Sequence, residues 1–534
     1  VGGSDDIHKP GGTVLRNLQD GNFKGSLYVV NPKMDEVQGI KAYRDVKDLP
    51  EVDCAILAIA AKFCPSTVEV LAKQKNTKAF IILSAGFHEE NEEGAKLERQ
   101  IVETINSVGG SLIGPNCIGV LTNHYSGVFT SPIPELNPQG VDLISGSGAT
   151  ALFIMDSGMQ KGIKFNSMYS VGNSAQLGVE EILEYMDESF DPKTSSRVKL
   201  LYVESIEKPE KLLKHASSLI RKGCRIAAVK SGGSAAGSRA ASSHTGALAS
   251  SDVAVEALFR KAGIVRCNGR DELMTVAGIF MHPEMKGRNM AVVTHAGGPA
   301  VMLTDALSNG GMDVPHIEGE KAQELLGKLF AGSSVGNPID FLATGTAEQL
   351  GYILDACDRD FDNIDGMAVI FGSPGLFPVF DVYNVLDEKM KTSKKPIFPI
   401  FPSSKIVKDE IAEFVSKGRV YFPDEVLFGN ALCKIYKTPA PQPEHFEMPD
   451  MDVKKIREVV DNAQNGYLSP DEIHALLDAA GVARAKEGVS DNEEEIVKMA
   501  KEIGFPLVMK VVGPIHKSDV GGVVLNVSDE ETVR

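Results

Sequence analysis

The sequence lacks paired cysteines and long apolar runs. Its seven cysteines are scattered, their number is odd, and no two of them form a C-x-x-C pair. This pattern argues against a disulfide framework and a structural zinc site, and it fits a reducing compartment. The longest apolar stretches, such as residues 52–61, fall short of the ~20 residues that cross a bilayer. No signal peptide is recognisable, so we expect a cytoplasmic protein.

Positively charged residues are also fewer than negatively charged ones. The 534 residues include 55 Lys and Arg against 72 Asp and Glu, which gives a formal net charge of −17. An acidic chain repels nucleic-acid backbones and anionic membrane surfaces, so neither is expected as a partner. An anionic substrate must therefore be held by local donors and not by the overall field.

Apolar, β-branched runs alternate with amphipathic helical patterns over most of the chain, which is typical of parallel α/β domains. The length allows about three to five domains. Strands are predicted at residues 27–30, 54–58, 79–83, 141–144, 200–203, 226–229, 290–293 and 367–370. Helices are predicted at residues 13–18, 95–107, 179–186, 208–221, 251–262 and 321–329.

Proline-rich and connector-like segments divide this pattern. Residues 130–138 hold three prolines, residues 282–287 look like a connector, and residues 438–443 alternate three prolines. Alternating prolines stiffen a chain and prevent a helix. The expected units are domains at 1–133, 134–285 and 286–437, a linker at 438–451, and a different α/β module at 452–534.

A glycine-rich loop opens the first domain. Gly2, Gly3 and Ser4 are followed by Gly11 and Gly12 at the start of a helical pattern. Such a loop lets backbone N–H groups approach a phosphate at a helix N-terminus.

The next strand ends in Asn31, Pro32 and Lys33. An NAD site would have an acidic residue there for the ribose hydroxyl. A lysine suits a ligand with additional phosphate, such as NADP or coenzyme A. The alternative interpretation is that Lys33 is a solvated turn residue.

One histidine stands out among small residues. His244 lies in the segment 242–249, Ser-Ser-His-Thr-Gly-Ala-Leu-Ala, between a strand and a predicted helix at 251–262. We expect a turn with many free N–H donors near a helix start. There a phosphate on the imidazole would be stabilised by those donors and by the helix dipole, worth about 0.3–2 kcal/mol per contact. The alternative is a capping or packed histidine.

Further polar groups follow other strands. Glu204 ends the strand at 200–203 and could accept the second ring N–H of a histidine, fixing its tautomer; a surface glutamate is the alternative. Ser147-Gly148 and Gly297-Gly298 each follow a strand and open a helix. With His244, they predict several helix N-termini facing one phosphate.

Together these motifs resemble the NDP-forming acyl-CoA synthetase family, which includes ADP-forming acetyl-CoA synthetase and the related succinyl-CoA synthetases. The resemblance covers essentially the whole chain, and the segment 114–119, Gly-Pro-Asn-Cys-Ile-Gly, is among its most specific parts. It implies an α/β protein with a Rossmann-like CoA-binding domain, two flavodoxin-like domains of the succinyl-CoA synthetase type, and the start of an ATP-grasp domain.

The resemblance also implies roles for single residues. His244 would be the phosphorylated residue, and Glu204 would support it. Contacts with CoA or phosphate are implied for the residues that match the family's loops: Gly3, Ser4, Gly12, Lys33, Asn116, Ser147, Gly148, Asn173, Gly297 and Gly298.

The tail resembles the beginning of an ATP-grasp domain. Residues 506–510 are similar to a strand whose lysine, here Lys510, contacts the phosphates of ATP. Residues 515–523 match a second histidine segment, which makes His516 a candidate relay between His244 and the nucleotide. Mg²⁺ is implied as well, with its ligands expected beyond residue 534, so no metal ligand is assigned within the chain.

The implied activity is that of an ADP-forming acid–thiol ligase with small-molecule substrates, and a homo-oligomer is expected. Acyl-CoA and phosphate would give acyl phosphate and CoA, and the phosphoryl group would pass through histidine to ADP. One rival is the acyl-CoA-sensing module of a protein lysine acetyltransferase, in which the phosphohistidine position is typically lost. Another is an NAD(P)-dependent oxidoreductase, which the segment 31–33 argues against. The resemblance does not name the carboxylic acid.

Overall fold

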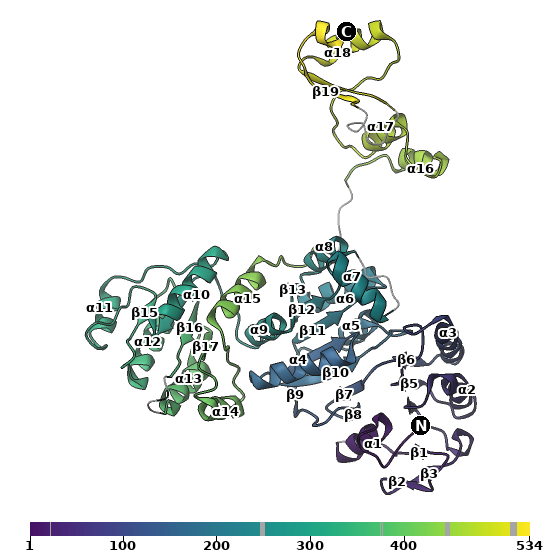
Figure 1. Cartoon of the computed structure of the whole chain (residues 1–534). Helices are drawn as coiled ribbons and strands as arrows, with labels where there is room; N and C mark the ends of the chain where they lie inside the picture. The colour runs from purple at the N-terminus through teal and green to yellow at the C-terminus, as the bar shows by residue number, and fades with distance from the viewer. Residues whose placement is uncertain (22, 246–250, 374, 376–377, 444–448, 513–520) are drawn as a thin grey trace. The chain divides into compact units, whose positions relative to one another are not determined.

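The structure is a computed structural model (Figure 1). It describes the chain except residues 22, 246–250, 374, 376–377, 444–448 and 513–520, and it describes only the backbone of residues 241–245. The chain divides into two compact units, Val1–Gln442 and Pro443–Arg534. The division falls within the proline-rich segment predicted as a linker. Among the described helices, none is both long and apolar enough to cross a bilayer.

The N-terminal part of the first unit contains two small sheets. Their strand orders are β1-β3-β2 and β4-β5-β6, and the second sheet is parallel. Val1 joins them, because its amino group donates to the Ile56 carbonyl (2.7 Å) and its carbonyl accepts from Ala58, while Gly2 donates to Val30. The elements are β1 (Val29–Val30), β2 (Glu36–Val37), β3 (Ile40–Tyr43), β4 (Cys54–Leu57), β5 (Ala79–Ile82), β6 (Ser111–Ile113), α1 (Pro10–Asp20), α2 (Cys64–Gln74) and α3 (Glu92–Ser107).

A seven-stranded sheet follows, with the order β13-β12-β11-β9-β10-β7-β8. Its five parallel strands have the flavodoxin order 2-1-3-4-5 when counted from β9. The strands are β7 (Gly119–Thr122), β8 (Tyr125–Val128), β9 (Leu136–Ser145), β10 (Phe165–Ser170), β11 (Val198–Val203), β12 (Arg225–Lys230) and β13 (Val265–Cys267). The helices are α4 (Gly148–Gln160), α5 (Val179–Glu188), α6 (Pro209–Arg221), α7 (Ala235–Thr245), α8 (Asp252–Ala262) and α9 (Arg270–Phe280).

The third part repeats this topology on a smaller scale. Its parallel sheet has the order β15-β14-β16-β17, again with the first strand between the second and the third. The strands are β14 (Met290–Thr294), β15 (Ile339–Asp340), β16 (Gly366–Ile370) and β17 (Ile397–Ile400). The helices are α10 (Gly297–Asn309), α11 (Glu320–Leu326), α12 (Ala347–Arg359), α13 (Phe380–Thr392), α14 (Lys408–Ser416) and α15 (Glu425–Lys437).

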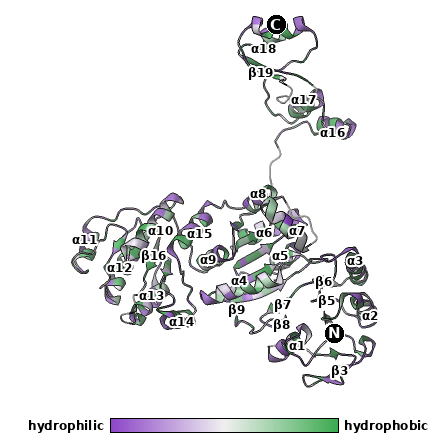
Figure 2. Cartoon of the chain, in the orientation of Figure 1, coloured by the Kyte–Doolittle hydropathy of each residue, from purple (hydrophilic) through white to green (hydrophobic). Residues whose placement is uncertain are grey.

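The hydrophobic core crosses the expected domain borders. One cluster of buried side chains includes Phe165 and Leu200 under the seven-stranded sheet as well as Val292 and Phe398 of the four-stranded sheet. The strands of both sheets are largely hydrophobic, as Figure 2 shows for β11, β12 and β16. Strands β7 and β8 precede residue 133, but β7 pairs with β10 and β8 pairs with β7, so the seven-stranded sheet extends across that expected border.

The second unit contains α16 (Val453–Asn462), α17 (Pro470–Ala479), α18 (Glu493–Ile503), β18 (Leu507–Lys510), β19 (Val523–Val527) and α19 (Glu530–Val533). Strands β18 and β19 form an antiparallel pair. The strands and helices predicted from hydrophobic periodicity all fall in the first unit, and each overlaps an observed element of the same type. The α/β fold class is therefore confirmed.

Candidate functional site

A cavity of about 460 Å³ lies at the carboxyl ends of β9, β10 and β11. These ends surround the point at which the strand order reverses, where open α/β sheets bind ligands. The cavity brings together five predicted residues from four separate segments: Asn116, Ser147, Gly148, Asn173 and Glu204.

Helix α4 contributes its N-terminus to this cavity. Ser147 is the N-cap, and its side chain accepts a hydrogen bond from the Thr150 amide (3.4 Å). The Ser145 hydroxyl fixes the preceding turn, since it donates to the Ser147 carbonyl (2.7 Å) and accepts from the Ser147 amide (3.2 Å). A Cβ atom on Gly148 would lie 2.5 Å from Ile118 Cγ2, so the first residue of the helix has no room for a side chain.

Hydrogen bonds connect the loop that carries Asn116 to the loop that carries Asn173. The Asn173 amide donates to the Pro115 carbonyl (2.9 Å), and Asn116 Nδ2 donates to Asn173 Oδ1 (3.3 Å). Gly172 has φ +55°, and a Cβ there would lie 2.2 Å from the Pro115 carbonyl oxygen. Glycine at position 172 therefore permits the close approach that brings the two asparagines into one wall.

Sequence reasoning missed three titratable residues beside this wall. Asn173 Nδ2 donates to Glu89 (2.5 Å) and to Glu98 (3.2 Å), and His88 Nδ1 lies 2.7 Å from the other oxygen of Glu98. Burial opposes the charge of Glu89, but hydrogen bonds from Asn173 and from the Gly86 and Phe87 amides hold its pKa below the ordinary value. The available signal was the cluster of acids that follows the strand at 79–83.

Glu204 is half-buried and lines the cavity just after β11. The Tyr202 hydroxyl donates to its Oε1 (3.4 Å). Burial raises the pKa of Tyr202, so this phenol remains a proton donor at neutral pH. The second carboxylate oxygen of Glu204 has no hydrogen bond to a described residue.

The sequence predicts a turn around His244. For the described residues, up to Thr245, this prediction is wrong. Residues Ala235–Thr245 form helix α7, in which Ser234 accepts a bond from the Gly237 amide and thereby caps the start. The segment is rich in alanine, whose high helix propensity outweighs the turn preference of its serines and glycine. His244 thus lies within α7, as its tenth residue, so the positive end of α7 is at Ala235 and not beside it. Its side chain lies outside the described residues.

The second predicted anion loop forms as expected but not at this cavity. Helix α10 starts at Gly297 directly after β14, and Gly298 follows in its first turn. Neither glycine lines the cavity that contains Glu204. The structure therefore does not bring this helix N-terminus to the same site.

The glycine loop and Lys33 come together in the N-terminal part. Asn31 links them, because its Nδ2 donates to the Gly3 carbonyl (2.8 Å) while its Oδ1 accepts from the Lys33 amide (2.9 Å). Gln38 Nε2 bridges the carbonyls of Ser4 (2.7 Å) and Gly12 (2.9 Å). A Cβ on Gly12 would lie 2.0 Å from the Asp6 carbonyl oxygen, so helix α1 packs directly on the loop backbone.

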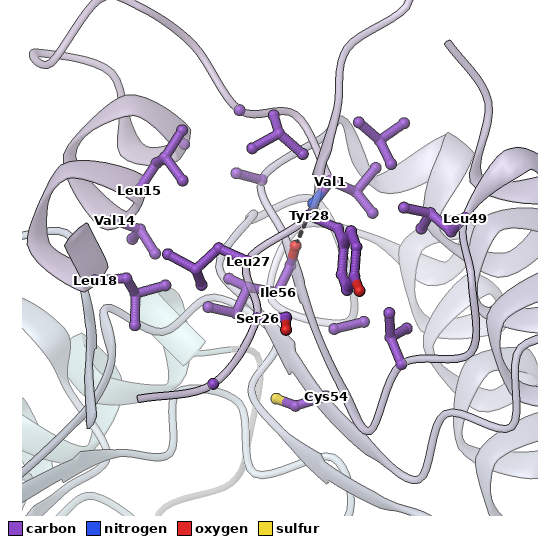
Figure 3. A pocket seen from close by; sticks show the side chains of 18 of the residues that line it. Val1, Val14, Leu15, Leu18, Ser26, Leu27, Tyr28, Leu49, Cys54 and Ile56 are labelled. Atoms are coloured by element: carbon purple, nitrogen blue, oxygen red, sulfur yellow. Dashed lines mark hydrogen bonds between the residues drawn. The ribbon is translucent and has the colours of Figure 1, made fainter. Parts of the chain in front are cut away.

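A larger cavity of about 780 Å³ lies beneath this loop. Its wall is mainly apolar: Figure 3 shows Val14, Leu15 and Leu18 of α1 on one side and Leu49 on the other. Gly3 lines it, but Ser4, Gly12 and Lys33 do not. Of the predicted residues of the loop, Gly3 is therefore shared with this cavity, while Ser4, Gly12 and Lys33 lie outside its lining.

In the second unit, Lys510 is exposed at the end of β18, where it pairs with Val523 of β19. His516 falls between these strands and lies outside the described residues. Within the described parts of the chain, no cluster of three or more His, Cys, Asp or Glu could hold a metal ion.

Three family models match the chain. Residues 1–123 match a CoA binding domain, residues 138–280 match a succinyl-CoA ligase like flavodoxin domain, and residues 459–534 match an ATP-grasp domain. These matches include the loops that build both the glycine-rich site and the cavity around Glu204.

Characterised proteins match along nearly the whole length. The acetate–CoA ligase [ADP-forming] I of Archaeoglobus fulgidus is 32% identical over 99% of this chain and 76% of that protein. The 4-hydroxybutyrate–CoA ligase [ADP-forming] of Nitrosopumilus maritimus is 29% identical over 100% of this chain and 77% of that protein. A solved structure, an acetyl-coenzyme A synthetase of Ca. Korarchaeum cryptofilum in complex with phosphate and ADP, aligns with a TM-score of 0.73 and 26% identity, covering 82% of this chain and 93% of that one.

Proposed function

Since this chain belongs to the NDP-forming acyl-CoA synthetase family, and is accordingly a ligase that forms acyl-CoA with ADP as a product, we propose how its residues carry the reaction. In the direction that makes ATP, a phosphate oxygen attacks the thioester carbon, the C–S bond breaks, and CoA leaves as acyl phosphate forms. A histidine nitrogen then takes the phosphoryl group and releases the carboxylate. ADP finally accepts the phosphoryl group as ATP.

The cavity at the β9–β11 ends is the proposed place of the first two steps. The observation that carries this proposal is the union of α4's N-terminus, Asn116, Asn173 and Glu204 in one cavity. Backbone N–H groups at the start of a helix stabilise phosphate oxygens. The asparagine amides add neutral donors that need no counter-charge.

His244 is the proposed phosphoryl acceptor, and Glu204 is its proposed supporting residue. A neutral imidazole nitrogen is nucleophilic near pH 7, and a carboxylate on the opposite ring N–H fixes the tautomer and stabilises the positive charge that develops. Glu204 suits this role because it lines the cavity, and among the described residues only its Oε1 accepts a hydrogen bond, from Tyr202. His516 is the proposed relay to the nucleotide at Lys510.

The N-terminal glycine loop is the proposed site of the CoA phosphates. The absence of side chains at Gly11 and Gly12 lets the loop backbone and the first turn of α1 approach each other, which is the arrangement of a phosphate loop. Lys33 stands on the adjoining turn and would neutralise an additional phosphate.

Further properties belong to this proposal. Mg²⁺ would accompany the nucleotide, but the described residues offer no cluster for it, so no step is assigned to it here. A cytoplasmic location is supported by seven free cysteines, six of them buried. A homo-oligomer is also proposed. The relatives differ in their acid, acetate in one case and 4-hydroxybutyrate in another, so the acid of this chain is left to a panel of acyl-CoA thioesters.

The test uses acyl-CoA and radiolabelled inorganic phosphate without nucleotide. We expect release of free CoA and a protein-bound label that is labile in acid and stable in base, as a phosphohistidine is. His244→Ala should abolish the label while CoA still binds, because the glycine loop is a separate site. His124→Ala is the matched control, since His124 is exposed in the β7–β8 turn.

Addition of ADP then tests the relay. His516→Ala should retain the label and fail to pass it to ADP, whereas direct transfer would leave ATP formation unchanged. Normal labelling of His244→Ala would overturn the proposed acceptor. The comparisons favour this enzyme over the regulatory sensor, which would bind acyl-CoA without releasing CoA.

A further inference from the structure

His88 occupies a position in the cavity that no motif had pointed to. It lies between β5 and α3 and lines the same cavity as Glu204. Its Nδ1 is 2.7 Å from Glu98 Oε1, and the two side chains are 28% and 11% exposed. The ring is therefore half-buried against α3 with an edge left towards the cavity.

The partner of His88 is itself held in place from two other loops. Glu98 accepts from Asn173 (3.2 Å), and Asn173 in turn accepts from Asn116 (3.3 Å). Glu89 shares Asn173 and is fixed by the Gly86 amide (2.6 Å). With Glu98 accepting the Nδ1 proton, Nε2 is the nitrogen that remains, and among the described residues no group bonds to it.

The remaining charges of the cavity are mostly negative. Its lining includes Glu180, Glu181, Glu204 and Glu207, and among the described residues that line it Lys208 is the one Lys or Arg. The Lys208 amine is engaged 2.7 Å from Glu181. An anionic substrate that enters this acidic cavity needs a positive group with a free donor, and His88 is placed to supply it.

We propose that His88 is a substrate-binding residue whose imidazolium Nε2–H donates to an oxygen of inorganic phosphate, and of the acyl phosphate formed from it. This rests on the proposed function of the cavity. His88 makes and breaks no covalent bond; it offsets the phosphate charge while Glu98 fixes the plane of the ring. The hydrogen bond to Glu98 raises the pKa of His88, and the charges of Glu98, Glu89 and Glu207 act in the same direction against its partial burial. These interactions shift the protonation equilibrium of His88 towards the cationic form.

The test is calorimetric titration of the whole chain with inorganic phosphate, and separately with CoA. His88→Gln removes the charge and should weaken phosphate binding about tenfold or more, as expected for loss of a charge-assisted hydrogen bond. CoA affinity should stay within about twofold, which also shows that the variant is folded. His124→Gln is the matched control and should leave both affinities unchanged.

His88→Lys separates charge from structure. Wild-type phosphate affinity should fall as the pH rises through the raised pKa of His88, because the imidazolium loses its proton. The charged groups that face His88 are Glu98, Glu89 and Glu207. His88→Lys should keep its phosphate affinity to higher pH, which a merely structural role would not produce.

The outcomes are distinguishable. Unchanged phosphate affinity in His88→Gln, with wild-type binding intact, would overturn the role of His88 and leave the proposed function standing. A wild-type chain that binds CoA but no phosphate would overturn both. A pH profile that is the same for wild type and His88→Lys would also contradict the proposal.

Discussion

Helices α4 and α10 begin in nearly the same way. Each follows the first parallel strand of a sheet whose order reverses at that strand. The Ser145 hydroxyl bonds to the carbonyl (2.7 Å) and the amide (3.2 Å) of Ser147, and the Thr294 hydroxyl bonds to the carbonyl (2.8 Å) and the amide (3.0 Å) of Ala296. Both helices then start with glycine.

The residues that surround the N-termini of the two helices differ. Around α4, loops from other parts of the chain bring Asn116, Asn173 and Glu204 to a cavity. At α10, His295 spans the strand ends, with Nε2 2.7 Å from the Gly372 carbonyl and its ring 4.3 Å from that of Phe371. The same local motif therefore supports a site in one sheet and a packed junction in the other. Local sequence determines the helix start, and distant residues determine its use.

The largest expected effect comes from the first residue of each helix. In Gly148→Ala the new Cβ would meet buried Ile118 at 2.5 Å, whereas in Gly297→Ala it would lie 3.6 Å from Asp340. We expect acyl-CoA-dependent phosphate labelling to fall about 100-fold in Gly148→Ala, since a small displacement of reacting groups has such costs, and to change less than about twofold in Gly297→Ala. Equal effects would remove the distinction between the two helices.

Charge beside the helices provides the next test. Glu204→Gln keeps the shape but loses the carboxylate, so phosphoryl transfer should slow about 10- to 100-fold. Asp340→Asn near α10 is the matched control, because its Oδ1 accepts from the Leu342 amide (2.9 Å), a hydrogen bond that an Asn side chain can also accept. Its turnover should stay within about twofold. Similar losses in both variants would contradict a special role for Glu204.

The junction between the two sheets should respond to acid through His282. Its ring packs on Phe398 and Phe422, and its Nδ1 bonds to the Gly278 carbonyl (2.8 Å). Burial lowers the pKa of His282 to about 4 from an ordinary value of 6.5. Between these values the unfolded chain binds a proton that the folded chain does not, so stability is complete above about pH 6.5 and falls as the pH is lowered.

At pH 5 this loss amounts to about 2 kcal/mol of the free energy of unfolding. Urea unfolding at pH 7 and pH 5 measures it, and His282→Phe should lose about 2 kcal/mol less than wild type over this interval. The difference between the proteins isolates His282 from the other acids and bases. An equal loss of stability in wild type and His282→Phe would show that His282 binds a proton in the folded chain as readily as in the unfolded chain.

The smallest effect concerns the caps. Ser147 caps α4 with its side chain, while the corresponding residue of α10, Ala296, has no side-chain cap. Ser147→Ala should reduce stability by about 1 kcal/mol, and Ala296→Ser should raise it by about 0.5 kcal/mol. Thermal unfolding of the two variants against wild type measures both. If Ser147→Ala raised the stability or Ala296→Ser lowered it, the hydroxyl groups of Ser145 and Thr294, and not the N-cap side chains, would stabilise the helix starts.

The sequence was most informative where structure depends on near neighbours. Hydrophobic periodicity located the strands, and small residues after strands located the starts of α4 and α10. The prediction at α7 was wrong because the segment contains both alanines, which favour a helix, and serines, which favour a turn. The helix propensity of the alanines is the stronger effect, so the segment is helical. The contribution of His88, Glu89 and Glu98 could not be predicted, because it depends on how Asn173 meets α3 from 75 residues away in the chain. The family resemblance supplied roles for His244 and His516 that remain predictions.

The buried hydrophobic cluster that the two sheets share also affects how the protein unfolds. Because Phe165 and Val292 belong to one buried cluster, neither sheet can open without exposing apolar surface of the other. On heating, the segment from β7 to α15 should therefore melt in a single calorimetric transition, with hydrogen exchange in β9 and β14 slowing together. The part of the chain after the proline-rich segment should give a transition of its own.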